Sequence, residues 1–135
     1  IGRVQLTKLA GWTKTRQENA AFLSSNITEA ITPAVPEGYV HVYHQYTIRL
    51  EGATGEERDR FVTALKEEHQ VGSGVYYPIP NHRLPSLAPY APGLELPNTE
   101  KVAAECVSLP VHPSLSQADR ERIVAAVNTC AKAGA

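Results

Sequence analysis

Three stretches of the chain repeat apolar residues at steps of three and four positions, as one face of an amphipathic helix does. This pattern predicts helices over about residues 4–26, 54–69 and 116–132. The positions expected to face inward are Leu6, Leu9, Ala20, Leu23, Phe61, Ala64, Leu65, Ile123, Val124, Val127 and Cys130. Polar residues fill most other positions, so each helix is expected to bury one face and expose the other.

Polar pairs three residues apart mark where two of these helices begin. Thr54 is followed by Glu57, and Ser116 by Asp119, the spacing at which a hydroxyl and a carboxylate cap a first helical turn reciprocally. A short helix is also predicted, capped by residue 98 or 99 and ending near 106. The carboxylates interpreted as helix-end groups rather than acid–base catalysts are Glu57, Glu100 and Asp119.

Residues 39–50 alternate apolar and polar side chains and are rich in β-branched and aromatic types, which predicts a long strand in the middle of a sheet. Shorter strands are predicted over residues 71–77 and 107–109. Because strands alternate with helices over a length that suits one domain, we expect a single α+β domain over residues 1–135. Its sheet should have about three strands, antiparallel or mixed, with helices packed on one side.

A proline-rich stretch interrupts this periodic sequence. Eight of the ten prolines lie between Pro78 and Pro113, and residues 78–97 show no periodicity, which predicts a long irregular loop. Next to it or within it lie the aromatic and titratable side chains of Tyr76, Tyr77, His82 and Tyr90. They are interpreted either as packing residues or as the lining of a polar pocket, whose uncharged donors and acceptors suit sugar hydroxyls.

Composition narrows the class of protein further. The net charge of −1 gives no basic patch for nucleic acid, and no apolar run is long enough to cross a bilayer. No zinc-type ligand spacing occurs, so no metal site is predicted. Gly72-Ser73-Gly74 enters a predicted strand rather than a helix and is not interpreted as a phosphate loop. Cys106 and Cys130 are interpreted as small buried apolar residues of a protein from the reducing cytoplasm.

The start of the chain suggests a larger parent protein. The sequence contains no methionine and opens on Ile1, already within a predicted helix. Removal of an initiator methionine would also explain this, but we expect the chain to be a piece of a longer protein. The first helix would then pack on the missing part, and the isolated domain would expose apolar side chains such as Trp12 and Phe22.

Several segments share their order and spacing with one family. They are N-A-A-F-L at Asn19–Leu23, H-V-Y-H-Q-Y-T-I-R-L at His41–Leu50, E-R-D-R-F at Glu57–Phe61, Y-Y-P-I-P-N-H at Tyr76–His82 and L-P-N-T-E-K-V-A-A-E-C-V-S-L-P-V-H-P-S-L-S at Leu96–Ser116. Together they resemble the C-terminal part of the DegT/DnrJ/EryC1/StrS aminotransferases. These are pyridoxal-phosphate-dependent enzymes of fold type I that act on nucleotide-linked sugars. The resemblance covers essentially the whole chain.

The resemblance implies a division of labour between two domains. In this family the lysine that forms the Schiff base, and most cofactor contacts, lie in a large N-terminal domain that has no counterpart here. The resemblance therefore implies pyridoxal phosphate in the parent, and no catalytic residue or bound cofactor in this chain. It implies that the loop around His82 reaches the active site, with His82, Tyr77 and Tyr76 as substrate contacts. His82 is expected to be at least partly exposed, whereas His44 and Arg49 are interpreted as structural.

The leading hypothesis is a C-terminal domain that orients a nucleotide-linked keto sugar in a homodimeric aminotransferase, with an amino acid as amine donor. One alternative is a stand-alone, non-catalytic sugar-binding or regulatory module. Another is a structural or dimerisation fragment without a ligand. Neither nucleic acid nor a membrane is expected as a partner.

Overall fold

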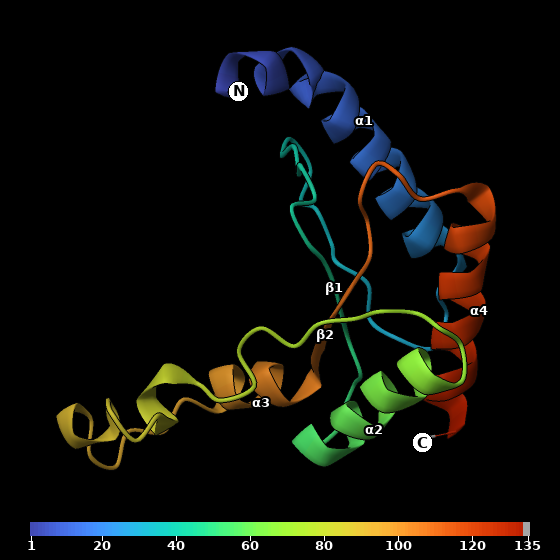
Figure 1. Cartoon of the computed structure of the whole chain (residues 1–135). Coiled ribbons are helices and arrows are strands. Elements are labelled where there is room, and N and C mark those ends of the chain that lie inside the picture. Colours follow the sequence, from blue (N-terminus) through green and yellow to red (C-terminus); the bar gives the residue numbers. More distant parts are fainter. Residues whose placement is uncertain (134–135) are drawn as a thin grey trace.

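Helices pack on one face of a small sheet in the computed structural model, which describes residues 1–133 (Figure 1). The elements are α1 (Gly2–Asn26), β1 (Tyr46–Arg49), α2 (Gly55–Glu67), the 3₁₀ turns η1 (Asn81–Arg83) and η2 (Ala88–Tyr90), α3 (Pro97–Glu105), β2 (Cys106–Leu109) and α4 (Gln117–Ala133). The predicted α+β class is confirmed. None of the described helices has the length and hydrophobicity needed to cross a membrane.

The sheet is antiparallel and narrow. β1 pairs with β2 from Tyr46 opposite Leu109 to Arg49 opposite Cys106. Single bridges extend it on both sides, with Ile31 joined to Arg49 and Gly74 joined to Ser108. The strand predicted over residues 71–77 is therefore only one bridge. Glycines at two of these positions weaken a strand, because they lose more entropy on ordering and bring no side chain to pack.

The strand predicted over residues 39–50 is also much shorter than expected. Tyr43 adopts a φ of +47°, a left-handed conformation that is unusual for a bulky residue and interrupts extended backbone. Two side chains of α1 hold this kink, because Arg16 Nη1 donates to the Tyr43 carbonyl at 3.2 Å and Gln17 Nε2 donates to the His41 carbonyl at 3.0 Å. The backbone before the kink leaves the sheet, so Val40 and Val42 are exposed rather than buried.

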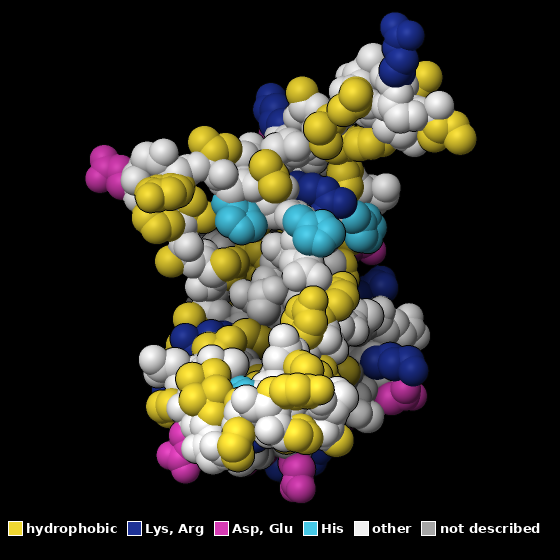
Figure 2. All heavy atoms as spheres, turned by 90° about the vertical axis from the view of Figure 1, so that its left-hand side faces the viewer, with side chains coloured by type: hydrophobic (Ala, Val, Ile, Leu, Met, Phe, Trp, Pro, Cys, Tyr) yellow, Lys and Arg dark blue, Asp and Glu magenta, His cyan; other side chains and the backbone are white. Residues whose placement is uncertain are grey.

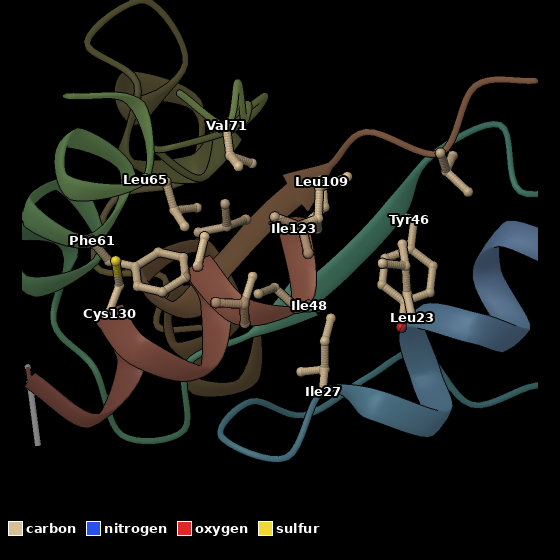
Figure 3. Close-up of a cluster of buried hydrophobic side chains, with 14 of the residues drawn as sticks. Leu23, Ile27, Tyr46, Ile48, Phe61, Leu65, Val71, Leu109, Ile123 and Cys130 are labelled. Atoms are coloured by element: carbon tan, nitrogen blue, oxygen red, sulfur yellow. The ribbon is translucent and has the colours of Figure 1, made fainter. Parts of the chain in front are cut away.

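The core lies between the sheet and the helices α1, α2 and α4 (Figure 3). Tyr46 and Ile48 of β1 and Val107 and Leu109 of β2 point into it. The helical residues that meet them include Ala20, Leu23, Phe61, Leu65, Ile123, Val127 and Cys130. These inward positions are those that the helical periodicity predicted, and Cys130 is a buried apolar residue as expected.

The predicted helix starts are confirmed for two helices and wrong for a third. The side chain of Thr54 accepts from the Glu57 amide while Glu57 accepts from the Thr54 amide, and Ser116 and Asp119 do the same at α4. α3 instead starts at Pro97, with no side-chain cap from residue 98 or 99. Proline fits the first helical position because no intrahelical partner is needed there.

The first half of α1 projects away from the core (Figure 1). Leu6, Leu9 and Trp12 are exposed there, so the inward position predicted for Leu6 and Leu9 is wrong within this chain. The expected exposure of apolar side chains such as Trp12 on this helix is confirmed. The expectation is wrong for Phe22, which is half-buried against the core and lies under the Arg120 guanidinium at 5.2 Å. The exposed surface therefore belongs to the helix turns that have no neighbour within residues 1–133.

Candidate functional site

The face of the sheet opposite the core carries polar side chains. Strand alternation places Thr47 of β1 and Ser108 of β2 on this face. The two residues are register partners, and their hydroxyl oxygens lie 2.8 Å apart. Each hydroxyl is both a donor and an acceptor, so this pair offers hydrogen-bonding capacity on the open face.

A concavity of about 880 Å³ lies against this face; we call it the tyrosine hollow. β1, β2, α3 and the loop between α2 and α3 all contribute to its lining. Its polar lining residues are Gln45, Thr47, Tyr76, Tyr77, Asn81, His82, Asn98, Thr99, Cys106 and Ser108. Its apolar lining includes Val75, Ile79, Leu96 and Val102. A volume of this order suits a small-molecule ligand.

The three residues predicted from the sequence to contact a substrate all line the tyrosine hollow. Tyr76 and Tyr77 are exposed and present their rings and hydroxyls to solvent. His82 lines the hollow from η1. Tyr90, which shares the proline-rich loop, is 86% exposed and lies outside the lining. The structure thus brings three of the four side chains together, while their contact with a substrate remains a prediction.

His82 as a whole residue is partly exposed, as expected, but its side chain is only 5% exposed. His82 Nε2 lies 2.8 Å from Glu100 Oε1 at the start of α3. Since an ionised carboxylate only accepts hydrogen bonds, Nε2 carries the proton and donates. His82 is therefore tied to α3 and is not a freely exposed loop residue.

Glu100 gathers several donors on one carboxylate oxygen. Arg83 donates to Oε1 from Nη2 at 2.8 Å and from Nε at 3.2 Å, and the Leu96 amide donates at 3.3 Å. The hydrogen bond from His82, followed by those from Arg83 and Leu96, lowers the pKa of Glu100 to about 2. Glu100 thus serves a helix end, as predicted. It also binds His82 and Arg83 near the start of the proline-rich loop and Leu96 near its end. We call this set of contacts the Glu100 clasp.

A buried ion pair lies at the end of the sheet beside the tyrosine hollow. The Glu105 side chain is 1% exposed, and its Oε2 accepts from Arg49 Nη2 at 2.8 Å and from Arg49 Nε at 2.9 Å. Burial raises the pKa of Glu105, but hydrogen bonds from the Gly52 amide and from Arg49 outweigh it and leave the pKa lowered. The structural interpretation of Arg49 is therefore confirmed.

The thiol of Cys106 lines the tyrosine hollow directly after this ion pair. Cys106 is only partly buried, so the expectation of a buried cysteine is wrong here, because β2 turns this position to the open face. Burial nonetheless raises the pKa of its thiol.

The lining of the tyrosine hollow suits a neutral polar ligand better than a charged cofactor. It contains no lysine, arginine, aspartate or glutamate. A hollow that held pyridoxal phosphate would need a lysine for the aldehyde and donors for the phosphate. Within residues 1–133 no three His, Cys, Asp or Glu side chains are close enough together to hold a metal ion. Hydroxyl, amide and imidazole groups remain, and these match the hydroxyls of a sugar.

Several site residues were missed by sequence reasoning. Asn98 and Thr99 were interpreted as helix caps but line the tyrosine hollow. Thr47 and Ser108 are polar residues between apolar neighbours in the predicted strands. This alternation could have predicted that both side chains point away from the core. Their pairing depends on the register between distant strands, which no local pattern reveals.

Comparison with known proteins identifies relatives for most of the chain. A model of the DegT/DnrJ/EryC1/StrS aminotransferase family matches residues 1–128. A pleiotropic regulatory protein of Geobacillus stearothermophilus is 37% identical over 128 residues, which cover 90% of this chain and 32% of that protein. The UDP-N-acetyl-3-dehydro-alpha-D-glucosamine 3-aminotransferase of Acidithiobacillus ferrooxidans is 33% identical over 129 residues, which cover 94% of this chain and 33% of that protein.

A solved structure shares the fold. DesV of S. venezuelae, in complex with a ketimine intermediate, superposes with a TM-score of 0.84 and 28% identity, covering 96% of this chain and 34% of its own. The chain thus spans about a third of the length of the relatives it matches.

Proposed function

We propose a function from the premise that this chain belongs to the DegT/DnrJ/EryC1/StrS aminotransferase family. The chain is the C-terminal, substrate-orienting domain of an aminotransferase that acts on a nucleotide-linked keto sugar. It contributes contacts to the sugar but not the lysine that carries the cofactor. The observation that carries the proposal is the tyrosine hollow, whose lining offers neutral donors and acceptors in a cavity of about 880 Å³.

The residues of the hollow have separate tasks in this proposal. Tyr77 and Tyr76 hydrogen-bond sugar hydroxyls from the rim, where their exposed side chains reach a ligand without rearrangement. His82, which is hydrogen-bonded to Glu100, holds the loop in the position in which it lines the hollow and contacts the sugar. Because Glu100 holds this loop before a ligand arrives, less conformational entropy is lost on binding.

The remaining parts of the reaction belong to the rest of the proposed parent. Pyridoxal phosphate, when bound, supplies the electron sink that transamination needs. The five lysines of this chain lie on α1, α2, α3 and α4, outside the tyrosine hollow, so the cofactor lysine is assigned to the missing domain. An amino acid as amine donor, a homodimeric assembly and a cytoplasmic location complete the proposal.

A regulatory role is the second candidate, because the 37% identical relative is a pleiotropic regulatory protein. In that case the tyrosine hollow binds a sugar as a signal and no amine is transferred. Amine transfer to a nucleotide-linked keto sugar by the full-length protein distinguishes the two candidates. A protein that binds such sugars and transfers no amine belongs to the second.

The role of the tyrosine hollow is tested by steady-state kinetics on the full-length protein that carries this domain. Tyr77→Phe removes one hydroxyl and should lower kcat/KM about tenfold, since a hydrogen bond to a ligand is worth about 1 kcal/mol or more. Tyr90→Phe removes the same group outside the hollow and should leave kcat/KM unchanged. Equal effects of the two substitutions would mean that the tyrosines of this loop do not contact the substrate.

His82→Ala tests the wall of the hollow and should lower kcat/KM by about 10- to 100-fold. His69→Ala, in the turn after α2 and away from the hollow, is the control and should have almost no effect. Circular dichroism and a melting curve of each variant separate lost contact from lost folding, because His82 is nearly buried. A normal kcat/KM in a folded His82→Ala protein would contradict the proposed role.

A further inference from the structure

A second, smaller concavity of about 350 Å³ adjoins the tyrosine hollow on the same side of the molecule. The two concavities lie side by side, because both are lined by Gln45, Gly74, Tyr76 and Ser108. Its ionisable lining side chains, apart from Tyr76, are those of Arg16, His44 and His112. We call it the cationic hollow, since no aspartate or glutamate is among its lining residues.

Histidine and basic side chains gather visibly on this side of the molecule. Figure 2 shows histidine side chains beside a basic side chain in the upper half of the view. Two of the lining residues, His44 and His112, are exposed, and Arg16 is half-buried. His41 lies nearby, with its ring 4.4 Å from that of Tyr43. Donors from distant parts of the chain therefore meet at this surface.

The kink at Tyr43 connects this surface to α1. Arg16 Nη1 donates to the Tyr43 carbonyl, which uses one of the five N–H groups of the guanidinium and leaves others for a ligand. His41 Nδ1 accepts from the Tyr43 amide at 2.9 Å, so both polar backbone groups of the kinked residue are satisfied. Unusual backbone held in place in this way is concentrated at binding sites. Here it determines the course of the backbone at His44.

His112 is held by the same helix. Asn19, one turn after Arg16 on α1, is buried and donates from Nδ2 to the His112 carbonyl at 3.0 Å. Asp119 lies close enough to His112 for the two side chains to interact electrostatically. Asp119 already accepts from the Ser116 amide and hydroxyl at 2.9 and 2.6 Å. It therefore caps α4 and does not line the cationic hollow.

The loop at residues 72–74 forms the opposite side. Gly74 is bridged to Ser108, and the segment before it is irregular backbone that does not lead directly into a helix. Ser73 Oγ is buried and has no hydrogen-bond partner among the described residues. Ser73 is among the residues that line the cationic hollow, so this unpartnered hydroxyl lies beside the proposed site.

We propose that the cationic hollow binds a phosphate-type anion through Arg16, His44 and His112. A guanidinium matches the oxygens of phosphate by charge and by geometry, and imidazole N–H groups add donors around it. The position beside the tyrosine hollow suggests the diphosphate of a nucleotide-linked sugar as the anion, and in this respect the inference rests on the proposed function. Free pyrophosphate has the same chemistry.

The test follows the imidazole Hε1 protons of the five histidines by NMR in the 135-residue chain. Inorganic pyrophosphate is added at constant pH, with sodium chloride keeping the ionic strength constant. The resonances of His44 and His112 should shift and saturate, whereas His69, in the turn after α2, should not move. Shifts shared by all five histidines, or reproduced by chloride alone, would overturn the proposal.

Variants assign the binding to named groups. Arg16→Gln should weaken pyrophosphate about 10- to 100-fold, the usual effect of losing a charged hydrogen-bond donor. Because Arg16 also holds the Tyr43 kink, His112→Gln is the second variant, since the Asn19 bond to the His112 carbonyl does not depend on the side chain. It should weaken binding about three- to tenfold. Unchanged affinity in both folded variants would overturn the proposal.

Uridine diphosphate and uridine identify the source of the anion. Uridine diphosphate binding at least as tightly as pyrophosphate, with no binding of uridine, supports a nucleotide ligand. Binding of pyrophosphate alone leaves the anion site intact but separates it from the sugar-nucleotide substrate. Failure of the anion site can be distinguished from failure of the proposed function. Tyr77→Phe tests the tyrosine hollow and leaves Arg16, His44 and His112 unchanged.

Discussion

The two faces of the β1–β2 sheet are built from neighbouring residues but have different tasks. Tyr46 and Ile48 point into the core, where α1 and α4 cover them (Figure 3). Thr47, between them in sequence, points to the opposite face and lines the tyrosine hollow. Side-chain alternation along an extended strand therefore places core residues and residues of the hollow within the same four positions.

This separation has an energetic consequence. A core side chain loses its packing partners when it is shortened, and the cavity left behind adds to the cost. A side chain on the open face has water or ligand as its neighbour and can change with little loss of folding energy. The open face can therefore carry specific polar groups, and the following substitutions test how far the distinction holds.

Arg49 is the strongest test, because alternation assigns it to the open face whereas its charge serves a buried partner. Arg49→Met removes the cation 2.8 Å from the nearly buried Glu105 carboxylate and leaves the more exposed Lys101, whose Nζ lies 3.9 Å from Glu105 Oε1. Removing one partner of a buried ion pair costs about 3–5 kcal/mol, so the free energy of unfolding should fall by that amount. Urea denaturation measures it.

Arg60→Met is the matched control for Arg49. Its guanidinium lies 3.9 Å from Glu57 on an exposed helix surface, where such pairs are worth about 1 kcal/mol or less. A loss in Arg49→Met no larger than in this control would show that Glu105 does not need its partner.

Ile48→Ala and Thr47→Ala compare the two faces directly. Ile48 is fully buried, so its truncation should lower the free energy of unfolding by about 2–5 kcal/mol. Thr47→Ala removes a hydroxyl that bonds Ser108 and should cost about 0.5–1.5 kcal/mol. Similar losses in the two variants, measured by the same urea titration, would contradict the division between faces.

Glu100→Gln tests whether the negative charge of Glu100 holds the proline-rich loop in place beside the open face. Because the folded pKa of about 2 lies below the ordinary value of 4.5, the clasp stabilises the loop above about pH 4.5 and this contribution is lost as the pH falls toward 2. Amide hydrogen exchange at Leu96 should become roughly tenfold faster in Glu100→Gln at neutral pH. The variant should also lose part of the acid dependence of exchange in the loop.

Glu51→Gln provides the comparison for Glu100, since it neutralises an exposed carboxylate in the turn after β1. Exchange at Leu96 should match the unaltered chain in this variant. Slow exchange at Leu96 in Glu100→Gln would mean that the prolines alone hold the loop.

The two cysteines provide the smallest expected effect. Cys106 lines the tyrosine hollow, whereas Cys130 is buried among core side chains. Burial raises the pKa of both thiols, so alkylation near neutral pH should be slow for each, and roughly tenfold faster or more at Cys106. Mass spectrometry of iodoacetamide-treated protein locates the modification. Preferential labelling of Cys130 would contradict the assignment of Cys106 to the accessible face and of Cys130 to the core.

Local rules predicted the helices and much of the core from the sequence. The capping pairs Thr54–Glu57 and Ser116–Asp119 involve residues three apart, so their energetics hardly depend on the rest of the fold. The inward positions of α2 and α4, such as Phe61 and Ile123, follow from helical periodicity because any stable packing must bury that stripe. The grouping of Tyr76, Tyr77 and His82 was visible because they are close in sequence.

Only the tertiary structure decided the remaining features. The strand predicted to start at residue 39 starts only at Tyr46, after the kink at Tyr43. Arg16, which lies 27 residues before Tyr43 in the chain, holds this kink. The His82 side chain is nearly buried, and its Nε2 donates a hydrogen bond to Glu100, which lies 18 residues later in the chain. Sequence by itself determined the helices and the family motifs, since these depend on neighbouring residues. Which polar groups meet across the loops depends on strand register and loop closure, which exist only once the whole chain has packed.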